Sequence, residues 1–254
     1  MSLTPRRSEF RQIADILRTK IESGEYAPGS LLPSQPELAA EYQVSQPTIN
    51  QAVRILRTEG LIRVARGIGA IVREIPVIQR DAMARYHQTA RERAGSRGAF
   101  DGEIKSLGMI PRSDLTVSRI RAPDNIATAL QLPANSYVVV RKRHMYANDY
   151  PVQLAPSYIP ADIADNTPLS EKDSGPGGII SRFKDLGYEQ VRITEAVKVR
   201  RATAEEQSFL RLEQESPVTE IFHIGYTAEN KPVEVCIHSI PSHLWILNYE
   251  WDIH

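Results

Sequence analysis

Three amide side chains stand close together in the stretch Val44 to Leu56, VSQPTINQAVRIL, where a solvated helix face would usually carry lysine and glutamate. Gln46, Asn50 and Gln51, together with Arg54, fall outside the apolar positions of this stretch. An amide presents a donor and an acceptor side by side, which matches the major-groove edge of adenine. An ordinary polar helix face is the alternative, and the amides by themselves do not exclude it.

A helix has to present these side chains, and the same stretch carries the signals for one. Ser45 is a suitable N-cap. Pro47 is tolerated in the first turn, where a backbone N–H has no helical partner. Ile49, Val53 and Leu56 then recur at helical spacing and form the expected buried stripe.

Two more helices are expected before this one. Residues 6 to 23 carry apolar side chains at helical spacing, and GEYAPGSLLPS then breaks the pattern with two glycines and two prolines. Ser34 starts a short helix over QPELAAEYQ, and only Val44 and Ser45 separate it from the helix at Gln46. Two short helices joined by so tight a turn have the outline of a helix-turn-helix.

A β-hairpin is expected directly after these helices. Beyond Gly60 the sequence LIRVARGIGAIVRE has two β-rich runs on either side of RGIG. A hairpin in this position is a wing, whose tip can reach phosphates or a minor groove with Arg66 and with the backbone N–H groups of Gly67 and Gly69.

The ordered run of PGSLLPS, ELA, VS and GLI, followed by GIGA, resembles the winged-helix domain of GntR-type transcription regulators over Phe10 to Arg73. Many members have arginine where this chain has Gln46 and Asn50. Because arginine reads guanine and the amides read adenine, we predict an operator rich in A·T at the core of each half-site. The candidates for DNA contact are Ser34, Ser45, Gln46, Thr48, Asn50, Gln51, Arg54, Arg66, Gly67 and Gly69.

An arginine-rich stretch follows the wing. Residues 75–100, IPVIQRDAMARYHQTARERAGSRGAF, show little apolar periodicity. We interpret residues 76–97 as a solvated linker between domains at 1–75 and 98–254. A hinge that contacts phosphates, or that orders when ligand binds, is the alternative.

The remaining chain contains an internal repeat. One copy begins at Arg121 with RAPDNIATALQL, and the other begins at Arg201 with RATAEEQSFLRL. Each copy reads as a strand, a short helix and a long β-hairpin, and Thr203 with Glu206 forms a capping box in the second. Two such copies are expected to lie side by side in one antiparallel sheet with helices on one face, as an α+β domain.

Positions where the two copies differ in chemistry are not needed for the shared scaffold. Arg141 and Arg143 lie on one face of a strand because side chains alternate along it. Glu234 and His238 lie on a polar face of a strand in the second copy. Together these groups could hold a small anionic or zwitterionic ligand, although a solvated strand face is the alternative.

Residues 98 to 251 resemble the UTRA ligand-binding domain of the HutC subfamily, whose fold is similar to chorismate lyase. The motifs RKRHM, PVQLAPSYIP, GPGGIISRFKDLGY and TEAVKVRRATAEE carry this resemblance. It implies that the arginine pair binds the anionic group of an effector and that Glu234 binds its polar body. Ala155 stands where a further family carboxylate is expected, which disfavours a phosphosugar. The candidates for effector contact are Arg141, Arg143, Tyr158, Gly177, Glu195, Glu234 and His238.

The charge balance, the cysteine count and the lengths of the apolar runs limit the classes of protein to which this chain can belong. The 254 residues carry 31 basic and 31 acidic side chains, so DNA contact has to be local. The single cysteine, Cys236, excludes an intrachain disulfide and fits a reducing cytoplasm. No apolar run in the sequence is long enough to span a membrane, and the stretch MSLTPRRSEF lacks the apolar core of a signal peptide, so we expect neither feature.

The sequence therefore predicts a two-domain transcription regulator. It combines an N-terminal winged helix-turn-helix with a C-terminal α+β antiparallel-sheet domain. We expect a homodimer that binds a palindromic operator as a repressor and is released by a small-molecule effector. No cofactor, metal site or catalytic residue is expected. The alternatives are an enzyme with lyase-like chemistry in the C-terminal domain and a DNA binder without an effector.

Overall fold

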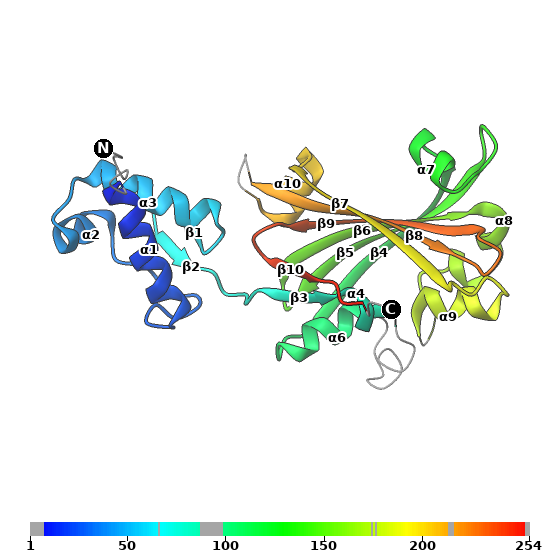
Figure 1. Ribbon diagram of the computed structural model, residues 1–254, viewed down its shortest axis with the longest axis horizontal. Coiled ribbons are helices and arrows are strands. Elements are labelled where there is room, and N and C mark those ends of the chain that lie inside the picture. The colour runs from blue at the N-terminus through cyan, green and yellow to red at the C-terminus, as the bar shows by residue number, and fades with distance from the viewer. Residues whose placement is uncertain are drawn as a thin grey trace. The chain divides into compact units, whose positions relative to one another are not determined.

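The computed structural model describes residues 8–65, 67–86, 99–173, 175, 177–212 and 216–251. The chain divides into two compact units, Met1–Pro76 and Val77–His254. Figure 1 shows the helices and strands of each unit.

The first unit consists of three helices and a two-stranded hairpin, as the sequence predicts (Figure 1). Its core is built from the helical stripes, and Leu17, Leu38, Ile49 and Leu56 are fully buried in it. The antiparallel hairpin closes over a three-residue loop, where Ala65 faces Gly69. The elements are α1 (Glu9–Glu22), α2 (Gln35–Tyr42), α3 (Gln46–Thr58), β1 (Ile62–Ala65) and β2 (Gly69–Val72).

Leu56 holds α3 against this core, and its truncation is expected to destabilise the first unit. Leu56→Ala leaves a cavity in a fully packed interior, which costs about 2–5 kcal/mol of unfolding free energy. Urea unfolding followed by circular dichroism in the far ultraviolet measures this loss. Ile68→Ala is the control, because Ile68 is 63% exposed at the tip of the hairpin and its loss should change stability little. Equal losses in both variants would contradict the proposed core.

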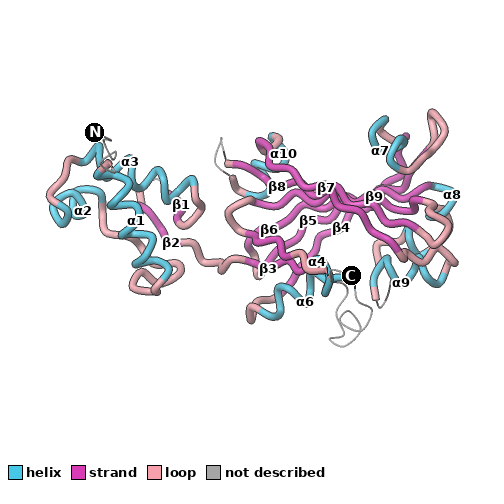
Figure 2. The backbone as a smooth tube through the Cα atoms, in the orientation of Figure 1, coloured by secondary structure: helices cyan, strands magenta, loops and turns pink. Residues whose placement is uncertain are grey.

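The second unit is built on one six-stranded sheet in the order β4-β5-β6-β9-β8-β7 (Figure 2). Each half contains a strand, a helix and a hairpin, which confirms the internal repeat. The two hairpins meet at the centre, where β6 pairs antiparallel with β9. The strands are β4 (Pro111–Arg121), β5 (Tyr137–Ala147), β6 (Tyr150–Pro160), β7 (Arg192–Arg201), β8 (Pro217–Tyr226) and β9 (Pro232–Pro241).

Helices cover both faces of this sheet. The helices of the two repeats, α7 (Asp124–Ala129) and α10 (Ala204–Leu210), lie on one face, as expected from the sequence (Figure 1). On the other face lie α6 (Ala99–Ser106) and α9 (Gly178–Asp185), with the short α8 (Ala161–Ala164) and the 3-10 turn η1 (Pro168–Ser170) near the strand ends. Of this second group, α6 and α9 line a cavity over that face of the sheet.

Part of the stretch interpreted as a solvated linker is instead folded into the second unit. Strand β3 (Ile78–Asp81) pairs in parallel with the C-terminal strand β10 (Trp245–Asn248), and helix α4 (Ala82–Tyr86) follows it. Ile78 and Arg80 are both buried, because they alternate along β3 and point inward. The rest of that stretch, residues 87–97, lies outside the described residues.

Candidate DNA-contacting surface and effector cavity

Helix α3 presents the predicted amides to solvent. The Ser45 side chain caps the helix by accepting a hydrogen bond from the Thr48 backbone N–H at 3.4 Å, and Pro47 occupies the first turn. Gln46, Asn50 and Arg54 follow one another at four-residue intervals along one exposed stripe, and Gln51 is exposed beside it. In the described residues none of these four side chains makes a hydrogen bond or ion pair with the protein, so their polar groups are available to a ligand such as DNA.

The three predicted hydroxyl contacts also serve the helix starts. Ser34 forms a capping box with Glu37, in which the glutamate accepts the Ser34 N–H at 2.7 Å. The hydroxyls of Ser45 and Thr48 hydrogen-bond to each other at 2.9 Å. All three lie at the N-terminal ends of α2 and α3, where backbone N–H groups favour phosphate.

The tip of the hairpin is open. Gly67 and Gly69 are exposed, with φ of 76° and 122°, and a Cβ added at Gly67 would meet nothing within 4 Å. At Gly69 an added Cβ would meet only Leu31 Cδ2, at 3.5 Å, so little side-chain bulk surrounds either glycine, and glycine tolerates the positive φ of both positions. Arg66, the predicted charge at this tip, lies outside the described residues.

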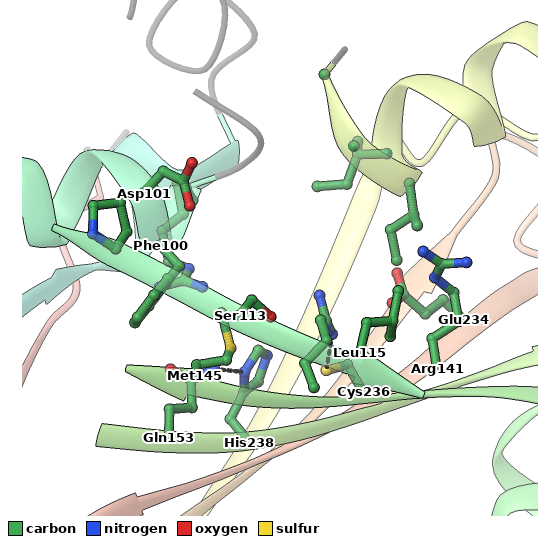
Figure 3. A pocket seen from close by; sticks show the side chains of 18 of the residues that line it. Phe100, Asp101, Ser113, Leu115, Arg141, Met145, Gln153, Glu234, Cys236 and His238 are labelled. Atoms are coloured by element: carbon green, nitrogen blue, oxygen red, sulfur yellow. Dashed lines mark hydrogen bonds between the residues drawn. The ribbon is translucent and has the colours of Figure 1, made fainter. Parts of the chain in front are cut away.

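A cavity of about 640 Å³ lies over one face of the six-stranded sheet. Side chains from β5, β6, β8 and β9 form its floor, and α6, α9 and the segment before α9 form its walls. Figure 3 shows Gln153, Cys236 and His238 on the floor, with Phe100 and Asp101 on the α6 side. This volume is typical of a site for a small molecule.

The two predicted arginines lie side by side in the cavity but have different surroundings. Arg141 is buried, and its Nη1 donates to the carbonyl oxygens of Leu169, at 2.8 Å, and of Glu171. Its Nη2 reaches the Lys172 carbonyl oxygen at 3.4 Å. Burial, reinforced by the positive charge of Arg143, lowers the pKa of Arg141 to about 10. Arg141 therefore fixes the loop before α9 in this structure.

Arg143 uses two of its three guanidinium nitrogens in hydrogen bonds to described residues. Its Nε donates to the Ala155 carbonyl oxygen at 3.1 Å, and its Nη2 contacts Ser157 Oγ at 2.6 Å and Cys236 Sγ at 3.2 Å. In the described part of the chain its Nη1 makes no hydrogen bond. Arg143 lines the cavity, so this nitrogen can donate to an anionic group of a ligand.

A neutral histidine lies on the floor beside Arg143. His238 Nδ1 hydrogen-bonds to Gln153 Nε2 at 2.9 Å, and since an amide N–H can only donate, Nδ1 accepts and the ring proton sits on Nε2. Burial, together with the charges of Arg80 and Arg85, holds the pKa of His238 well below its usual value. Burial likewise raises the pKa of the Cys236 thiol.

Glu234 and Gly177 complete the predicted set at the cavity. Glu234 is buried, and its Oε2 accepts a hydrogen bond from Gln190 Nε2 at 2.9 Å. Its Oε1 makes no hydrogen bond within the described residues, so it can accept one from a ligand. Gly177 caps α9 with a φ of 79°, and Ser181 lies so close that an added Cβ would clash with it. Glycine is therefore required at this turn.

Two predicted effector residues are not part of the cavity wall. Tyr158 faces Val140 in the sheet and packs on the opposite face against Ile126 of α7 and Leu130, which directly follows α7, because even-numbered positions of β6 such as Tyr158 point away from the cavity. Glu195 lies behind His223, outside the wall. The structure thus differs from the prediction at both positions.

Other cavity residues were missed from the sequence. Arg85 and Phe100 come from α4 and α6, on either side of residues 87–98, and no periodic pattern marked them. The repeat could have pointed to His223, because His223 occupies in the second copy the position that Arg143 occupies in the first, and Gln153 shares a strand face with Ala155. The lining residues come from the five strands β4, β5, β6, β8 and β9 and from the helices α4, α6 and α9, and they meet only in the folded chain.

The neutral state of His238 is expected to make the second unit sensitive to acid. An unfolded histidine has a pKa near 6.5, so below about pH 6.5 the unfolded state takes up a proton that the folded state does not bind. The unfolding free energy should therefore fall from about pH 7.5 to about pH 5.5, by up to about 1.4 kcal/mol per pH unit for this proton.

His238→Gln should flatten this dependence. Both tryptophans, Trp245 and Trp251, belong to the second unit, so urea unfolding followed by tryptophan fluorescence reports on it alone. A fall with acid that is equal in the variant and the unaltered protein would show that His238 is not held neutral.

The described part of the chain was searched for groups of metal ligands and for helices that could span a membrane. There, no three His, Cys, Asp or Glu side chains come together in a way that could hold a metal ion. No helix among these residues is both long enough and apolar enough to cross a bilayer.

Comparison with known proteins identifies both units. A sequence profile described as "Bacterial regulatory proteins, gntR family" matches residues 10–72, and a "UTRA domain" profile matches residues 106–243. An HTH-type transcriptional regulator of Streptomyces coelicolor is 31% identical over 241 residues, which cover 92% of this chain and 89% of the relative. The HTH-type transcriptional repressor NagR of Bacillus subtilis is 27% identical over 220 residues, covering 85% and 84%.

A solved structure shows the same two-domain fold. The crystal structure of PhnF from Mycobacterium smegmatis covers 95% of this chain and 100% of its own, with a TM-score of 0.60 at 16% identity. The resemblance predicted from the sequence motifs is confirmed by the two profiles and by the Streptomyces relative. The chain belongs to the GntR family of bacterial regulatory proteins, as a ligand-responsive, DNA-binding transcription regulator with a UTRA domain.

Proposed function

We propose that this regulator is a cytoplasmic homodimeric repressor that leaves a palindromic operator when a small anionic effector enters the cavity. The proposal is carried by two sites, an amide-bearing recognition helix in one unit and a partly open cavity in the other, with buried polar side chains such as Arg141, Glu234 and His238 among its lining residues. Similarity to NagR, a protein named as a repressor, supports the direction of control. Two copies of a helix-turn-helix on a two-fold symmetric operator are the usual arrangement for such proteins.

On the DNA side, Gln46 and Asn50 are proposed to read bases. They lie in the first turns of α3, the part of a recognition helix that reaches base edges. Each amide can form a two-point contact with adenine, which supports an A·T-rich half-site core. Arg54 and the N–H groups of Gly67 and Gly69 are assigned to phosphates, where they fix the register of the helix.

On the ligand side, Arg143 and Glu234 set the proposed chemistry of the effector. The open Nη1 of Arg143 favours a carboxylate or phosphate, and the open Oε1 of Glu234 requires a hydrogen-bond donor on the same molecule. Ala155 is fully buried and offers no carboxylate for sugar hydroxyls. These features favour a small anion that carries its own N–H or O–H groups over a phosphosugar.

The protonation states of Cys236 and His238 favour a cavity that binds a ligand over one that catalyses a reaction. The thiol of Cys236 is protonated because burial raises its pKa, and a neutral thiol is a poor nucleophile. His238 is neutral because its pKa is held well below the usual value, and its Nδ1 is already hydrogen-bonded to Gln153. Its imidazole is therefore poorly suited to act as a general acid or base near pH 7.

Two measurements test this proposal. Analytical ultracentrifugation of the full chain, alone and with a palindromic duplex, should give two chains per particle and two chains per duplex. A panel of small carboxylates, amino acids and phosphates is then screened for release of a fluorescent duplex, and typical couplings predict a 5- to 150-fold loss of affinity, about 1–3 kcal/mol. A monomer on DNA would overturn the dimer, and an anion that tightens DNA binding would overturn release by effector.

A further inference from the structure

One row of side chains crosses the cavity floor and continues beyond it. Neighbouring strands place these residues directly opposite one another, so they share one face of the sheet. Three members of the row line the cavity, and the last one lies outside its wall. In order from β5 to β7 the row contains Arg141, Ser157, Cys236, His223 and Glu195.

Glu195 connects this row to strand β3. Its Oε1 accepts hydrogen bonds from His223 Nδ1, at 3.2 Å, and from Arg80 Nη2. Its Oε2 accepts from Arg80 Nη1 and from the Tyr249 hydroxyl, each at 3.0 Å. One carboxylate is therefore shared by a residue of the cavity wall, a residue of β3 and a residue that follows β10.

The shared contacts are buried and charged. Arg80 is 1% exposed, and the Glu195 side chain is 7% exposed. Burial alone would raise the pKa of Glu195, but hydrogen bonds from His223 and Arg80 outweigh it and hold that pKa well below its usual value. A buried guanidinium that loses a paired carboxylate is disfavoured, so the Arg80–Glu195 ion pair is one of the contacts that hold β3 in place.

Strand β3 is also the start of the second unit. It begins at Ile78, directly after the division between Pro76 and Val77. Besides Arg80, β3 is held by its pairing with β10 and by the hydrogen bond from Asn248 Nδ2 to Gln79 Oε1 at 2.9 Å. Strand β3 is therefore joined to the DNA-binding unit by a very short piece of chain.

We propose that Arg80, Glu195 and His223 form a relay that couples effector binding in the cavity to the DNA-binding unit. This inference rests on the proposed function and specifies how its cavity is regulated. A ligand that contacts the His223 ring moves Nδ1 away from Glu195. The carboxylate then shifts, Arg80 shifts with it, and β3 loosens from β10. The relay as it stands in this structure is the state that binds operator.

Two variants break the relay at different points. Glu195→Gln keeps the shape of the side chain but removes the charge that Arg80 and His223 share. His223→Ala removes only the hydrogen bond at the cavity end and keeps both charged partners, Arg80 and Glu195, so it should fold even if Glu195→Gln does not. The relay predicts that Glu195 and Arg80 shift when this hydrogen bond is lost.

The matched control is Glu206→Gln, which breaks another two-point ion pair, between the buried Glu206 and the partly buried Arg200 of the same strand β7. Arg200 and Glu195 are an odd number of positions apart, so this pair lies on the face of the sheet away from the cavity.

Hydrogen exchange of the full-length chain, read by mass spectrometry, tests the relay without DNA or effector. We expect amides of Ile78–Asp81 and Trp245–Asn248 to exchange about tenfold faster or more in both relay variants and to be unchanged in Glu206→Gln. Unchanged exchange in His223→Ala, or equal acceleration in Glu206→Gln, would overturn the relay, since the contacts would then serve stability alone.

Measuring operator affinity distinguishes a failure of the relay from a failure of the proposed function on which it rests. With a duplex that the unaltered protein selects, both relay variants should bind about tenfold more weakly than Glu206→Gln. Faster exchange with undiminished operator affinity would overturn the coupling while leaving the DNA-reading assignment intact. If the unaltered protein selects no sequence, the proposed function fails, and the exchange result still decides whether the His223 contact controls β3.

Discussion

Replacing Gln46 and Asn50 together by alanine is expected to weaken operator binding at least about 30-fold. Each two-point amide–adenine contact contributes about 1–3 kcal/mol of discrimination, and tenfold in affinity corresponds to about 1.4 kcal/mol, so two contacts give about 2 kcal/mol or more. Both side chains are exposed, and alanine is the better helix former, so the fold should survive. Fluorescence anisotropy at one fixed salt concentration measures the loss.

The double variant should also lose base preference. It should bind the operator and a duplex with G·C pairs at the half-site core almost equally, because phosphate contacts remain. Gln12→Ala, an exposed amide on α1, is the matched control and should change affinity less than about twofold. Unchanged affinity and preference in the double variant would show that α3 does not read bases.

Arg143→Ala is expected to abolish the response to effector while operator binding without effector stays intact. Removing one partner of a buried, hydrogen-bonded charge pair usually costs about 2–5 kcal/mol, which corresponds to a loss of effector affinity of about 30-fold or more. Isothermal titration with the anion found in the screen gives this affinity. Arg143→Lys should restore it only in part, since lysine keeps the charge but not the planar fork.

Arg141→Ala provides the contrast. Its guanidinium holds three carbonyl oxygens of the segment before α9, so its loss should lower the melting temperature of the second unit as well as disturb the cavity. Arg143 has only one such backbone contact. A fall in operator affinity of the Arg143→Ala variant without effector would assign Arg143 to the fold and contradict its role as an anion ligand.

Local signals in the sequence predicted most of the scaffold. The caps at Ser34, Ser45 and Thr203 and the stripes of α1 and α3 depend on residues a few positions apart, and all formed as expected. The repeat at Arg121 and Arg201 predicted two hairpins that share one sheet, because the same pattern of strand and turn residues recurs.

Contacts between distant segments could not be predicted in this way. The sequence of β3 was interpreted as linker because its partner strand, β10, lies at the other end of the chain. The burial of Arg80 can be understood only once β3 is paired with β10. The role of Arg141 depends on the path of a loop, which no periodicity encodes. Tyr158 is a different case, since strand alternation from Ser157 already places it on the opposite face.

Selection from a randomised duplex library tests the central claim most directly. The purified full-length chain is mixed with the library at about 0.15 M salt, and the retained duplexes are sequenced. We expect a two-fold palindrome with A·T pairs at the core of each half-site, read by Gln46 and Asn50 from two copies of α3. Retention without a consensus sequence would mean that only phosphates are bound, and it would contradict the assignment of a sequence-reading operator binder.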